Sequence, residues 1–541
     1  MKKKELVDDI IGMNEYVLQN IHSALVIAIE NEGKVDDSLQ LNFYNVVDDY
    51  YYQNDYAPVW SDTGHFKPIA NELLRYLDTA IMDGLFNRDY HYQSINEIKI
   101  QLEKDSVKMK DAVLWSKADI LLTDAFMHVI CDLKQGRILT DSASWKNDTS
   151  KLNVFFELNL NKFRKDILIS PLIQSLQPKI YGYHELKKGI RKFIDSMDTR
   201  TYTYINYPYK TDIEEDSIKF LNQLQLRLKE GGYLNSDQIK IFDSAALSNV
   251  ITSYQRKNNF LADGKISGKL IKHLNLTDKE KLKRIFISLD RYKELPDSMP
   301  NKYIWVNLPS YYLRVWDNDT IRLNSKIICG KPTTPTPILY GAINEMITYP
   351  TWTVPTSIIK KEMLPGLKKS TGYLARKGLK LLDSKGANID PATIDWSKYS
   401  KGIPYKIQQG SGDRNALGVM KFNFQNPFDV YLHDTNQRYF FNNSMRALSH
   451  GCVRVQEWKE LAFYISKNDS VNVTMGNSVL YNNDSITNWL DKKERHRIPV
   501  KNKIPLFIRY ITCEGTNGVI KFYDDIYDED KRMAEIYFAN Q

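Results

Sequence analysis

The sequence has few cysteines, and none of them forms a paired motif. Its four cysteines, Cys131, Cys329, Cys452 and Cys513, are widely scattered, and no CxxC pair occurs. Zinc knuckles and thioredoxin-like redox sites need closely spaced cysteines, so neither kind of site is supported. Cys131 ends a helical pattern and is expected to pack as a small apolar group.

A long apolar run is also missing. The run ALVIAI (24–29) is too short to cross a membrane or to form the core of a signal peptide, which needs roughly 7 to 15 apolar residues. The N-terminus MKKKELVDDIIGMNEY begins with lysines but places acidic residues where that core would lie. Two interpretations follow: a cytosolic protein, or a mature form whose leader has been removed.

The chain lacks a strong charge of one sign. Its 74 basic and 66 acidic residues give a formal net charge of +8 over 541 residues. Without a concentrated basic stripe, this bias does not indicate nucleic acid as a partner, although it is compatible with an acidic polymer. The composition, 42% hydrophobic and 26% charged, is that of a globular protein. Because the length exceeds what one core supports, we expect two to four domains.

The first part of the chain has a helical pattern without visible chemistry. Apolar residues recur there at spacings of three and four, as in Leu114, Ala118, Leu121, Leu122, Ala125 and Val129. This spacing places them on one face of a helix that looks into a core. We therefore expect residues 36–213 to form a helical scaffold domain.

Residues 214–276 form a compact unit with three predicted helices. Three local features mark it: the Gly232-Tyr233-Leu234 turn, a helix that ends in Tyr254-Gln255, and the Asp263-Gly264 turn. Together they resemble the small three-helix peptidoglycan-binding domain. An arbitrary three-helix bundle stays open as the alternative on these residues alone.

After residue 300 the apolar period changes from helical spacing to two. Ile304, Val306 and Leu308 alternate with more polar or aromatic neighbours, and Met420, Phe422 and Phe424 alternate later. Such alternation predicts half-buried strands, and hence a β-rich domain over residues 300–475.

Two segments depart from the strand pattern. Residues 356–403 are rich in lysine and punctuated by glycine, which predicts an insertion that folds over the sheet as a cap; a plain surface excursion is the alternative. After residue 475 the pattern looks helical again, so residues 476–541 are expected to form a C-terminal helical extension.

One polar stretch, YLHDTNQRYFFNNSMRALSHGCVRV (431–455), combines residues that can do chemistry. Val430 and Leu432 alternate with Tyr431 and His433, so the tyrosine and histidine share one face of a strand. Cys452 lies in a glycine-containing turn between strand and helix patterns. Backbone amides point outward at such a turn, and the positive end of a helix dipole would lie nearby.

This environment suits a cysteine nucleophile. A free thiol, with a reference pKa of about 8.5, is mostly protonated at neutral pH, and only the thiolate attacks well. A neighbouring imidazole and a helix N-terminus favour the thiolate, and backbone amides can bind an oxyanion. The stretch therefore suggests acyl transfer through a thioester. An accidental Cys–His neighbourhood, or a zinc site from His433, His450 and Cys452 without an obvious fourth ligand, are the alternatives.

The motif H…SHGC followed by Val453-Arg454-Val455 resembles the active-site motif of the YkuD-like L,D-transpeptidases. The segments GSGDRNALGVMKFNF (410–424) and YLHDT match that family too, so the resemblance covers about residues 300–475. The whole arrangement resembles the large YcbB-type L,D-transpeptidases of Gram-negative bacteria, and YAPVWSD (56–62) agrees with their scaffold. The implied fold is multidomain α+β: a helical scaffold, a three-helix peptidoglycan-binding domain, and a β-rich catalytic domain with an inserted capping subdomain.

The resemblance implies Cys452 as the nucleophile and His433 as its general base. The amides of Gly451 and Cys452, helped by the Tyr431 hydroxyl, would hold the oxyanion. No metal and no organic cofactor are implied.

Three further residues have supporting roles by the same resemblance. His450 would shape the catalytic loop together with its glycine neighbour. Asp434 would orient the histidine base through its backbone rather than its carboxylate. Arg454 would brace the site or bind a substrate carboxylate, with a structural ion pair as the alternative.

The reaction implied by the family begins with a peptidoglycan tetrapeptide stem. The thiolate attacks the carbonyl of the third residue, usually meso-diaminopimelate, and expels D-alanine; the side-chain amine of a second stem then takes the acyl group. Carbapenems would acylate the same cysteine, and cell-wall synthases are expected partners in wall remodelling and cell shape. The substrate lies outside the cytoplasm, so we expect a periplasmic protein and interpret the sequence as a form without its leader.

Two other functions stay open. An L,D-carboxypeptidase would use water in place of the acceptor amine, and a wall-binding scaffold would leave the cysteine idle. NlpC-type cysteine peptidases fit less well, because in them the cysteine precedes the histidine along the chain.

Overall fold

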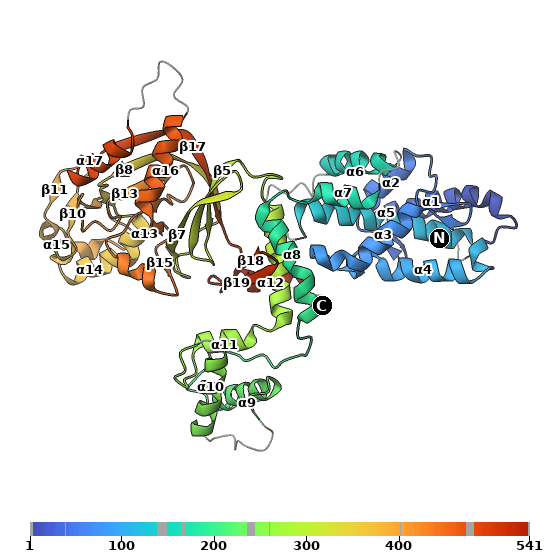
Figure 1. The fold of residues 1–541 in the computed structure, drawn as a ribbon, viewed down its shortest axis with the longest axis horizontal. Helices are drawn as coiled ribbons and strands as arrows, with labels where there is room; N and C mark the ends of the chain where they lie inside the picture. Colours follow the sequence, from blue (N-terminus) through green and yellow to red (C-terminus); the bar gives the residue numbers. More distant parts are fainter. Residues whose placement is uncertain are drawn as a thin grey trace, which may run out of the picture. The chain divides into compact units, whose positions relative to one another are not determined.

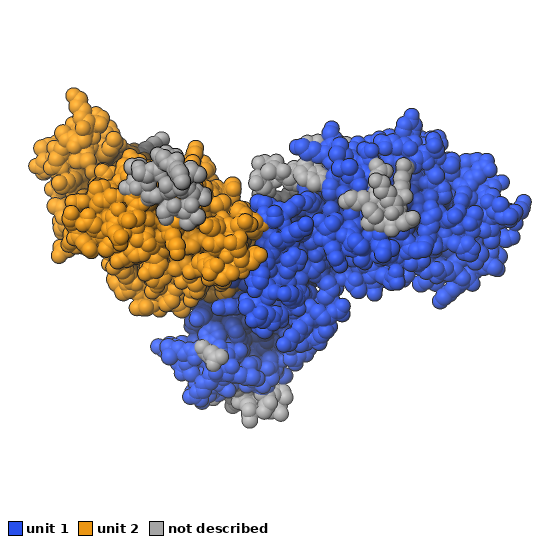
Figure 2. All heavy atoms as spheres, turned by 45° about the horizontal axis from the view of Figure 1, so that its top comes forward, with its two compact units in different colours: residues 1–298, 513–522, 530–541 blue, residues 299–512, 523–529 orange. Residues whose placement is uncertain are grey.

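The computed structural model describes residues 4–37, 39–137, 149–163, 168–234, 244–258, 260–400, 402–471 and 481–538. The chain divides into two compact units (Figure 2), one of residues 1–298, 513–522 and 530–541 and one of residues 299–512 and 523–529. Helices dominate the first unit and a large sheet the second (Figure 1), so the α+β multidomain class is confirmed. Within the described ranges, every helix is too short or too polar to cross a membrane.

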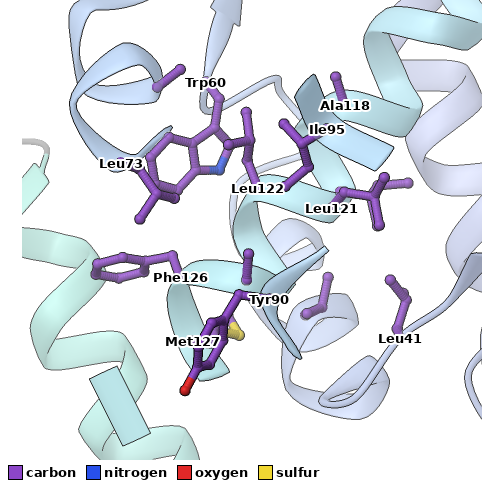
Figure 3. Packing of buried hydrophobic residues seen from close by; sticks show 14 of the residues in the cluster. Leu41, Trp60, Leu73, Tyr90, Ile95, Ala118, Leu121, Leu122, Phe126 and Met127 are labelled. Atoms are coloured by element: carbon purple, nitrogen blue, oxygen red, sulfur yellow. The ribbon is translucent and has the colours of Figure 1, made fainter. Parts of the chain in front are cut away.

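The scaffold part of the first unit is built around helix α5 (Ala112–Gln135), which is buried on nearly all sides. A helix that is apolar all round belongs in the centre of a core. Figure 3 shows Trp60, Leu122 and Phe126 packed together there. The helices around it are α1 (Met13–Glu30), α2 (Tyr44–Tyr52), α3 (Pro68–Thr79), α4 (Tyr92–Lys104), α6 (Thr149–Phe163) and α7 (Ile169–Leu176).

The expected start of this domain at residue 36 is wrong. Helix α1 packs against α5, and its residues Val17, Ile21 and Leu25 are buried in the same core. Their spacing of four is helical. The run ALVIAI lies in this helix, where Ala24, Leu25 and Ala28 are buried in this core while Val26 and Ile29 are exposed.

One buried carboxylate fixes the YAPVWSD segment. Asp119 on α5 accepts hydrogen bonds from the backbone N–H groups of Val59, Trp60 and Ser61 at 2.8, 3.0 and 3.0 Å. The Tyr51 hydroxyl donates to the same carboxylate at 2.7 Å. A buried carboxylate satisfied by several donors holds a loop in one conformation. This segment is therefore structural.

The first unit also contains the predicted three helices, α9 (Glu214–Glu230), α10 (Ser244–Lys257) and α11 (Gly268–Asn275), around a hydrophobic core of their own. The motif residues bond to one another: Gln255 Nε2 donates to Asp263 Oδ1 at 2.8 Å, and the Gly264 N–H donates to Gln255 Oε1 at 2.8 Å. Gly264 has φ +67°, and a Cβ there would lie 2.2 Å from Ser248 Oγ, so the turn needs glycine.

A further part of the first unit is formed by α8, which precedes these helices, by α12, which follows them, and by a hairpin near the C-terminus. Helix α8 (Tyr181–Ser196) packs against α12 (Asp278–Lys293) and against the hairpin of β18 (Cys513–Thr516) and β19 (Val519–Phe522). Gly515 makes this contact close, because a Cβ there would lie 2.2 Å from the Glu185 backbone.

The second unit is organised by a nine-stranded sheet in the order β15-β7-β16-β14-β13-β8-β17-β5-β6. A further pairing of β6 with β7 closes the sheet on itself. Helix α16 (Trp458–Val471) packs on β17, and α17 (Asn483–Asp491) precedes that strand (Figure 1). The strands are β5 (Lys302–Asn307), β6 (Tyr312–Asp317), β7 (Thr320–Gly330), β8 (Leu339–Thr348), β13 (Met420–Phe424), β14 (Leu432–His433), β15 (Ala447–Ser449), β16 (Val453–Val455) and β17 (Arg497–Arg509).

Two expectations about strands need correction. Strand β5 is buried on both faces, because Tyr303 and Trp305 are covered as well as Ile304 and Val306, whereas β13 shows the expected half-burial. The predicted C-terminal helical extension is also wrong, since β17 is a central strand, antiparallel to β8 and parallel to β5. Its register shifts between Pro499 and Ile504, and this irregularity hides the alternation in the sequence.

The insertion folds as a small subdomain with a hydrophobic core of its own. Its four-stranded sheet has the order β11-β10-β12-β9, formed by β9 (Trp352–Thr353), β10 (Leu379–Leu382), β11 (Asn388–Ile389) and β12 (Lys406–Gln409). Its helical part is α13 (Thr356–Ile358), the π-helix η6 (Ile359–Met363), α14 (Leu364–Lys369) and α15 (Tyr373–Arg376).

Candidate active site

The pairing of β14 with β16 sets His433, the predicted base, beside the strand that directly follows Cys452, the predicted nucleophile. The two strands are parallel, with Leu432 opposite Val453 and His433 opposite Arg454, and the Val453 N–H donates to the Tyr431 carbonyl at 3.1 Å. Leu432 and Val453 are fully buried in the core of the sheet. Since side chains alternate along a strand, Tyr431 and His433 share the opposite face with Cys452 and Arg454.

Cys452 leads into a strand and not into a helix. Strand β16 follows it directly, and helix α16 begins only at Trp458. The expected helix N-terminus next to the sulfur is therefore wrong, because a three-residue strand is too short to show in the apolar pattern.

Ser449 braces the turn that presents Cys452. Its hydroxyl accepts a hydrogen bond from the Gly451 N–H at 3.1 Å and donates to the Cys452 carbonyl at 2.6 Å. Gly451 has φ +124°, a conformation that favours glycine. The amides of Gly451 and Cys452 were both predicted to hold an oxyanion, but the Gly451 N–H already donates its hydrogen bond to Ser449. The Cys452 N–H has no hydrogen-bond partner in the described part of the chain.

The Cys452 thiol is half-buried, whereas Cys131, Cys329 and Cys513 are buried. Burial raises the pKa of this thiol above its usual value, while hydrogen bonding from Tyr431 and the charges of Lys421 and Arg454 act to lower it. The thiol is therefore protonated at rest and would need a base in order to act as a nucleophile.

His433 is suited to be that base because it is kept neutral. Its side chain is buried, and the residue is 4% exposed. Burial lowers the pKa of the imidazole to about 3, helped by the charges of Arg454 and Lys421 and opposed by hydrogen bonding to the backbone of Asp434 and Leu417. Its Nδ1 atom makes no hydrogen bond within the described residues. A neutral ring with a free nitrogen can accept a proton.

The carboxylate of Asp434 binds Val419 and Arg438 and not the imidazole. It accepts hydrogen bonds from the Val419 N–H at 3.0 Å and from the Arg438 guanidinium at 2.7 and 3.1 Å. Gly418, with φ +63°, makes room for it, because a Cβ there would lie 2.2 Å from Asp434 Oδ2. Only the backbone of Asp434 touches the base.

His450 is turned toward the insertion. Its Nε2 atom lies 2.5 Å from Oε1 of Glu362, a residue of η6, and Lys331 Nζ lies 3.9 Å from the same oxygen. The structure therefore does not join His450 with His433 and Cys452 in one cluster. Across the described ranges, His, Cys, Asp and Glu side chains form no group of three or more that could hold a metal ion.

Arg454 lies on the catalytic face without a carboxylate partner. Its Nη1 atom is 3.4 Å from Gln437 Oε1, its Nε atom is buried without a hydrogen bond, and it forms no ion pair with any described residue. Burial lowers the pKa of this guanidinium, and the nearby thiol opposes that shift. The structural ion pair that stayed open as its alternative role is absent from the described part of the chain.

Sequence reasoning missed two residues of this site. Lys421 of β13 lies opposite His433, and its Nζ atom is 3.8 Å from the centroid of the Tyr431 ring. Trp352 of β9 is the second. Burial and the neighbouring Cys452 raise the pKa of Tyr431 well above its usual value, and hydrogen bonding from the Trp352 side chain opposes that shift. The position of Lys421 between the apolar Met420 and Phe422 indicated that it lies on the opposite face of the strand from them. Nothing in the sequence linked Trp352 to this site.

In the comparison with known proteins, one family model matches part of each unit. Residues 301–473 match the family model described as the YkuD L,D-transpeptidase catalytic domain, and residues 45–190 match that of the Scaffold domain. A protein of Haemophilus influenzae, provisionally named L,D-transpeptidase, is 33% identical over 267 residues. The match covers 49% of this chain and 51% of that protein, so the chain spans about half the length of this relative.

Solved structures give fainter likenesses. The ertapenem-acylated catalytic domain of an E. faecium L,D-transpeptidase is 12% identical over 39% of this chain and 98% of its own, with a TM-score of 0.18. An L,D-transpeptidase from Mycobacterium smegmatis is 10% identical over 39% of this chain and 60% of its own, with a TM-score of 0.19. Likenesses of this size carry no weight beside the family match. The chain therefore contains a YkuD-type L,D-transpeptidase catalytic domain, preceded by a domain of the Scaffold family.

Proposed function

We propose that this protein is a cysteine-dependent peptidoglycan L,D-transpeptidase of the large YcbB type, which cross-links the third residues of two stem peptides. One observation carries the proposal: the β14–β16 register pairs His433 with Arg454, two residues after Cys452, so that the side chains of His433 and Cys452 lie on the same face of the sheet. The family of residues 301–473 supplies the reaction class.

Acylation starts from the neutral pair. His433 takes the proton of the Cys452 thiol as the sulfur attacks the carbonyl carbon of the third residue of a tetrapeptide stem. The Cys452 N–H and the Tyr431 hydroxyl stabilise the oxyanion. When the tetrahedral intermediate collapses, the peptide C–N bond breaks, the imidazolium protonates the leaving amine, and D-alanine departs from the thioester.

Deacylation repeats these steps with a second stem. The side-chain amine of its third residue, usually diaminopimelate, attacks the thioester carbonyl and gives a proton to His433. The C–S bond breaks, and the proton returns to the sulfur. Arg454, which lacks a carboxylate partner among the described residues, is free to bind a carboxylate of the stem with two parallel hydrogen bonds.

The other parts of the chain have roles in keeping with this chemistry. Residues 214–276 bind peptidoglycan, and the insertion at 356–403 covers the catalytic face as a cap. The protein acts in the periplasm, where its substrate lies, in wall remodelling and cell shape, beside cell-wall synthases. A carbapenem acylates Cys452 because its strained carbonyl is attacked like that of the stem.

Purified tetrapeptide muropeptides test the proposal. The wild-type protein should release D-alanine and form dimers linked between third residues, whereas Cys452→Ala should form neither while still binding sacculi. Tripeptide products without dimers would show an L,D-carboxypeptidase instead. Intact substrate in every reaction, with sacculus binding retained, would show an idle wall-binding scaffold.

A further inference from the structure

A cation that the mechanism above does not use lies beside the catalytic pair. Lys421 of β13 is opposite His433 of β14, and His433 is opposite Arg454 of β16. These three side chains therefore form one row across three adjacent strands, on the face that carries Cys452. The imidazole has a positive charge on each side.

The ammonium of Lys421 is held but not neutralised. Its Nζ atom lies 3.8 Å from the centroid of the Tyr431 ring, a cation–π distance. It forms no ion pair with any residue that the structure describes. The nearby carboxylate of Glu345 is engaged elsewhere, by Arg497 and Asn423 at 2.7 Å each. A half-buried cation without a counterion acts strongly on charge that develops next to it.

We propose that Lys421 is a positioning residue of the active site, whose ammonium stabilises the thiolate of Cys452. The inference rests on the proposed function only in taking Cys452 as the nucleophile. Tyr431 links the two groups, because its ring carries the ammonium and its carbonyl accepts a hydrogen bond from the N–H of Val453, the residue after Cys452.

The quantity that the Lys421 ammonium changes is the pKa of the Cys452 thiol. Lys421 lowers the pKa of the Cys452 thiol and of the His433 imidazole alike. This positive charge favours the thiolate but opposes the imidazolium. It therefore changes the loss of a proton from the site to solvent more than the transfer of a proton from Cys452 to His433. The charged and titratable groups around the sulfur and the ammonium are Tyr431 and His433 of β14, Arg454 of β16, Glu345 of β8, Arg497 of β17 and Asp429 of the loop before β14.

Alkylation of the full-length protein by iodoacetamide, followed by intact mass from pH 6 to pH 10, tests this role. Cys452 is the half-buried thiol, and the other three cysteines are buried, so Cys452→Ala supplies the blank. Lys421→Met should raise the midpoint of the profile by about one pH unit. Its rate at pH 7 should fall roughly threefold, because a more basic thiolate is also more nucleophilic.

Matched variants separate charge from shape. Lys421→Arg keeps the charge and should keep the midpoint close to that of the wild type, and Lys421→Gln should repeat the shift of Lys421→Met. Lys503→Met removes an exposed lysine of β17 and should leave the profile unchanged.

A wild-type midpoint in Lys421→Met and Lys421→Gln, or an equal shift in Lys421→Arg, would overturn the role of Lys421. The readout needs no turnover. A protein whose profile shifts as expected but which leaves muropeptides intact would contradict the proposed function and leave this inference standing.

Discussion

At the scale of single residues, the site depends on a histidine that is buried in its neutral form. Burial makes the largest contribution to lowering the pKa of His433, and the positive charges of Arg454 and Lys421 lower it further, so the ring stays uncharged. In the proposed mechanism, a neutral His433 can accept a proton at neutral pH without first losing one to solvent. The same burial has a consequence for stability.

Below the usual histidine pKa, the second unit should lose stability as the pH falls. The pKa of His433 is about 3 in the folded state, against about 6.5 in the unfolded chain. Between these values the unfolded state binds a proton that the folded state does not, so the free energy of unfolding decreases with decreasing pH. At pH 5 the loss from this residue should be about 2 kcal/mol.

Urea titrations of the wild type and of His433→Gln measure this loss. Pulsed hydrogen exchange of peptides from β13, β14 and β16 reports unfolding of the sheet at each pH. The wild type should lose about 1.6 kcal/mol more than His433→Gln between pH 6.5 and pH 5. Parallel pH dependences of the two proteins would mean that His433 is not buried in its neutral form.

At the scale of elements, one contact joins the insertion to the catalytic loop. Glu362 of η6 lies 2.5 Å from His450 Nε2, and both side chains are about 40% exposed. An exposed pair of this kind contributes only about 0 to 1 kcal/mol, so it can position an element without deciding whether the unit folds.

Removing this charge should loosen the insertion locally. Glu362→Gln should increase the deuterium uptake rate of residues 356–376 by up to roughly fivefold, the factor that corresponds to about 1 kcal/mol, and leave the urea midpoint of the sheet unchanged. Hydrogen exchange with mass spectrometry measures both. Glu494→Gln, which breaks the His496–Glu494 pair at 3.1 Å elsewhere in the unit, is the control. Equal uptake in Glu362→Gln and wild type would show that the contact does not hold the insertion.

The elements also show what the sequence could predict. The alternation of Met420, Phe422 and Phe424 identified β13 because one face of that strand is covered and the other open. Strand β5 is covered on both faces, so alternation described it poorly. Strand β17 was missed because its pairing with β8 shifts register between Pro499 and Ile504, and its partners β8 and β5 lie about 150 to 200 residues earlier in the chain.

The candidate residues that are close together in the sequence could be grouped from the sequence alone. Tyr431, His433, Gly451, Cys452 and Arg454 fall within 25 residues, and local patterns placed them on one strand and one turn. The partners that come from other elements, Lys421, Trp352 and Glu362, were not predicted, because their contacts depend on tertiary packing.

At the scale of the whole molecule, the chain combines a catalytic unit with helical units that have cores of their own. The three helices of residues 214–276 are the clearest example. The Asp198 N–H donates to the Asp278 carboxylate at 2.9 Å, so the chain enters and leaves this region at nearby points. A short linker can therefore replace the helices.

Replacing residues 201–276 with a Gly-Ser linker should separate wall binding from chemistry. Because the three-helix unit is proposed to bind peptidoglycan, sacculus binding should fall at least roughly tenfold, or by about 1.4 kcal/mol. Carbapenem acylation of Cys452 should stay within about twofold of the wild-type rate, since the catalytic sheet is built from other residues. Pull-down with purified sacculi and intact mass measure the two. Unchanged sacculus binding would move the wall contact to another part of the chain.

The central claim is that His433 activates Cys452 for attack on an acyl carbon, and intact-mass kinetics with meropenem tests it most directly. The wild type should gain one covalent adduct, Cys452→Ala none, and His433→Gln the same adduct at least roughly a hundredfold more slowly, as expected for loss of a general base. An adduct on Cys452→Ala, or an undiminished rate in His433→Gln, would contradict the account.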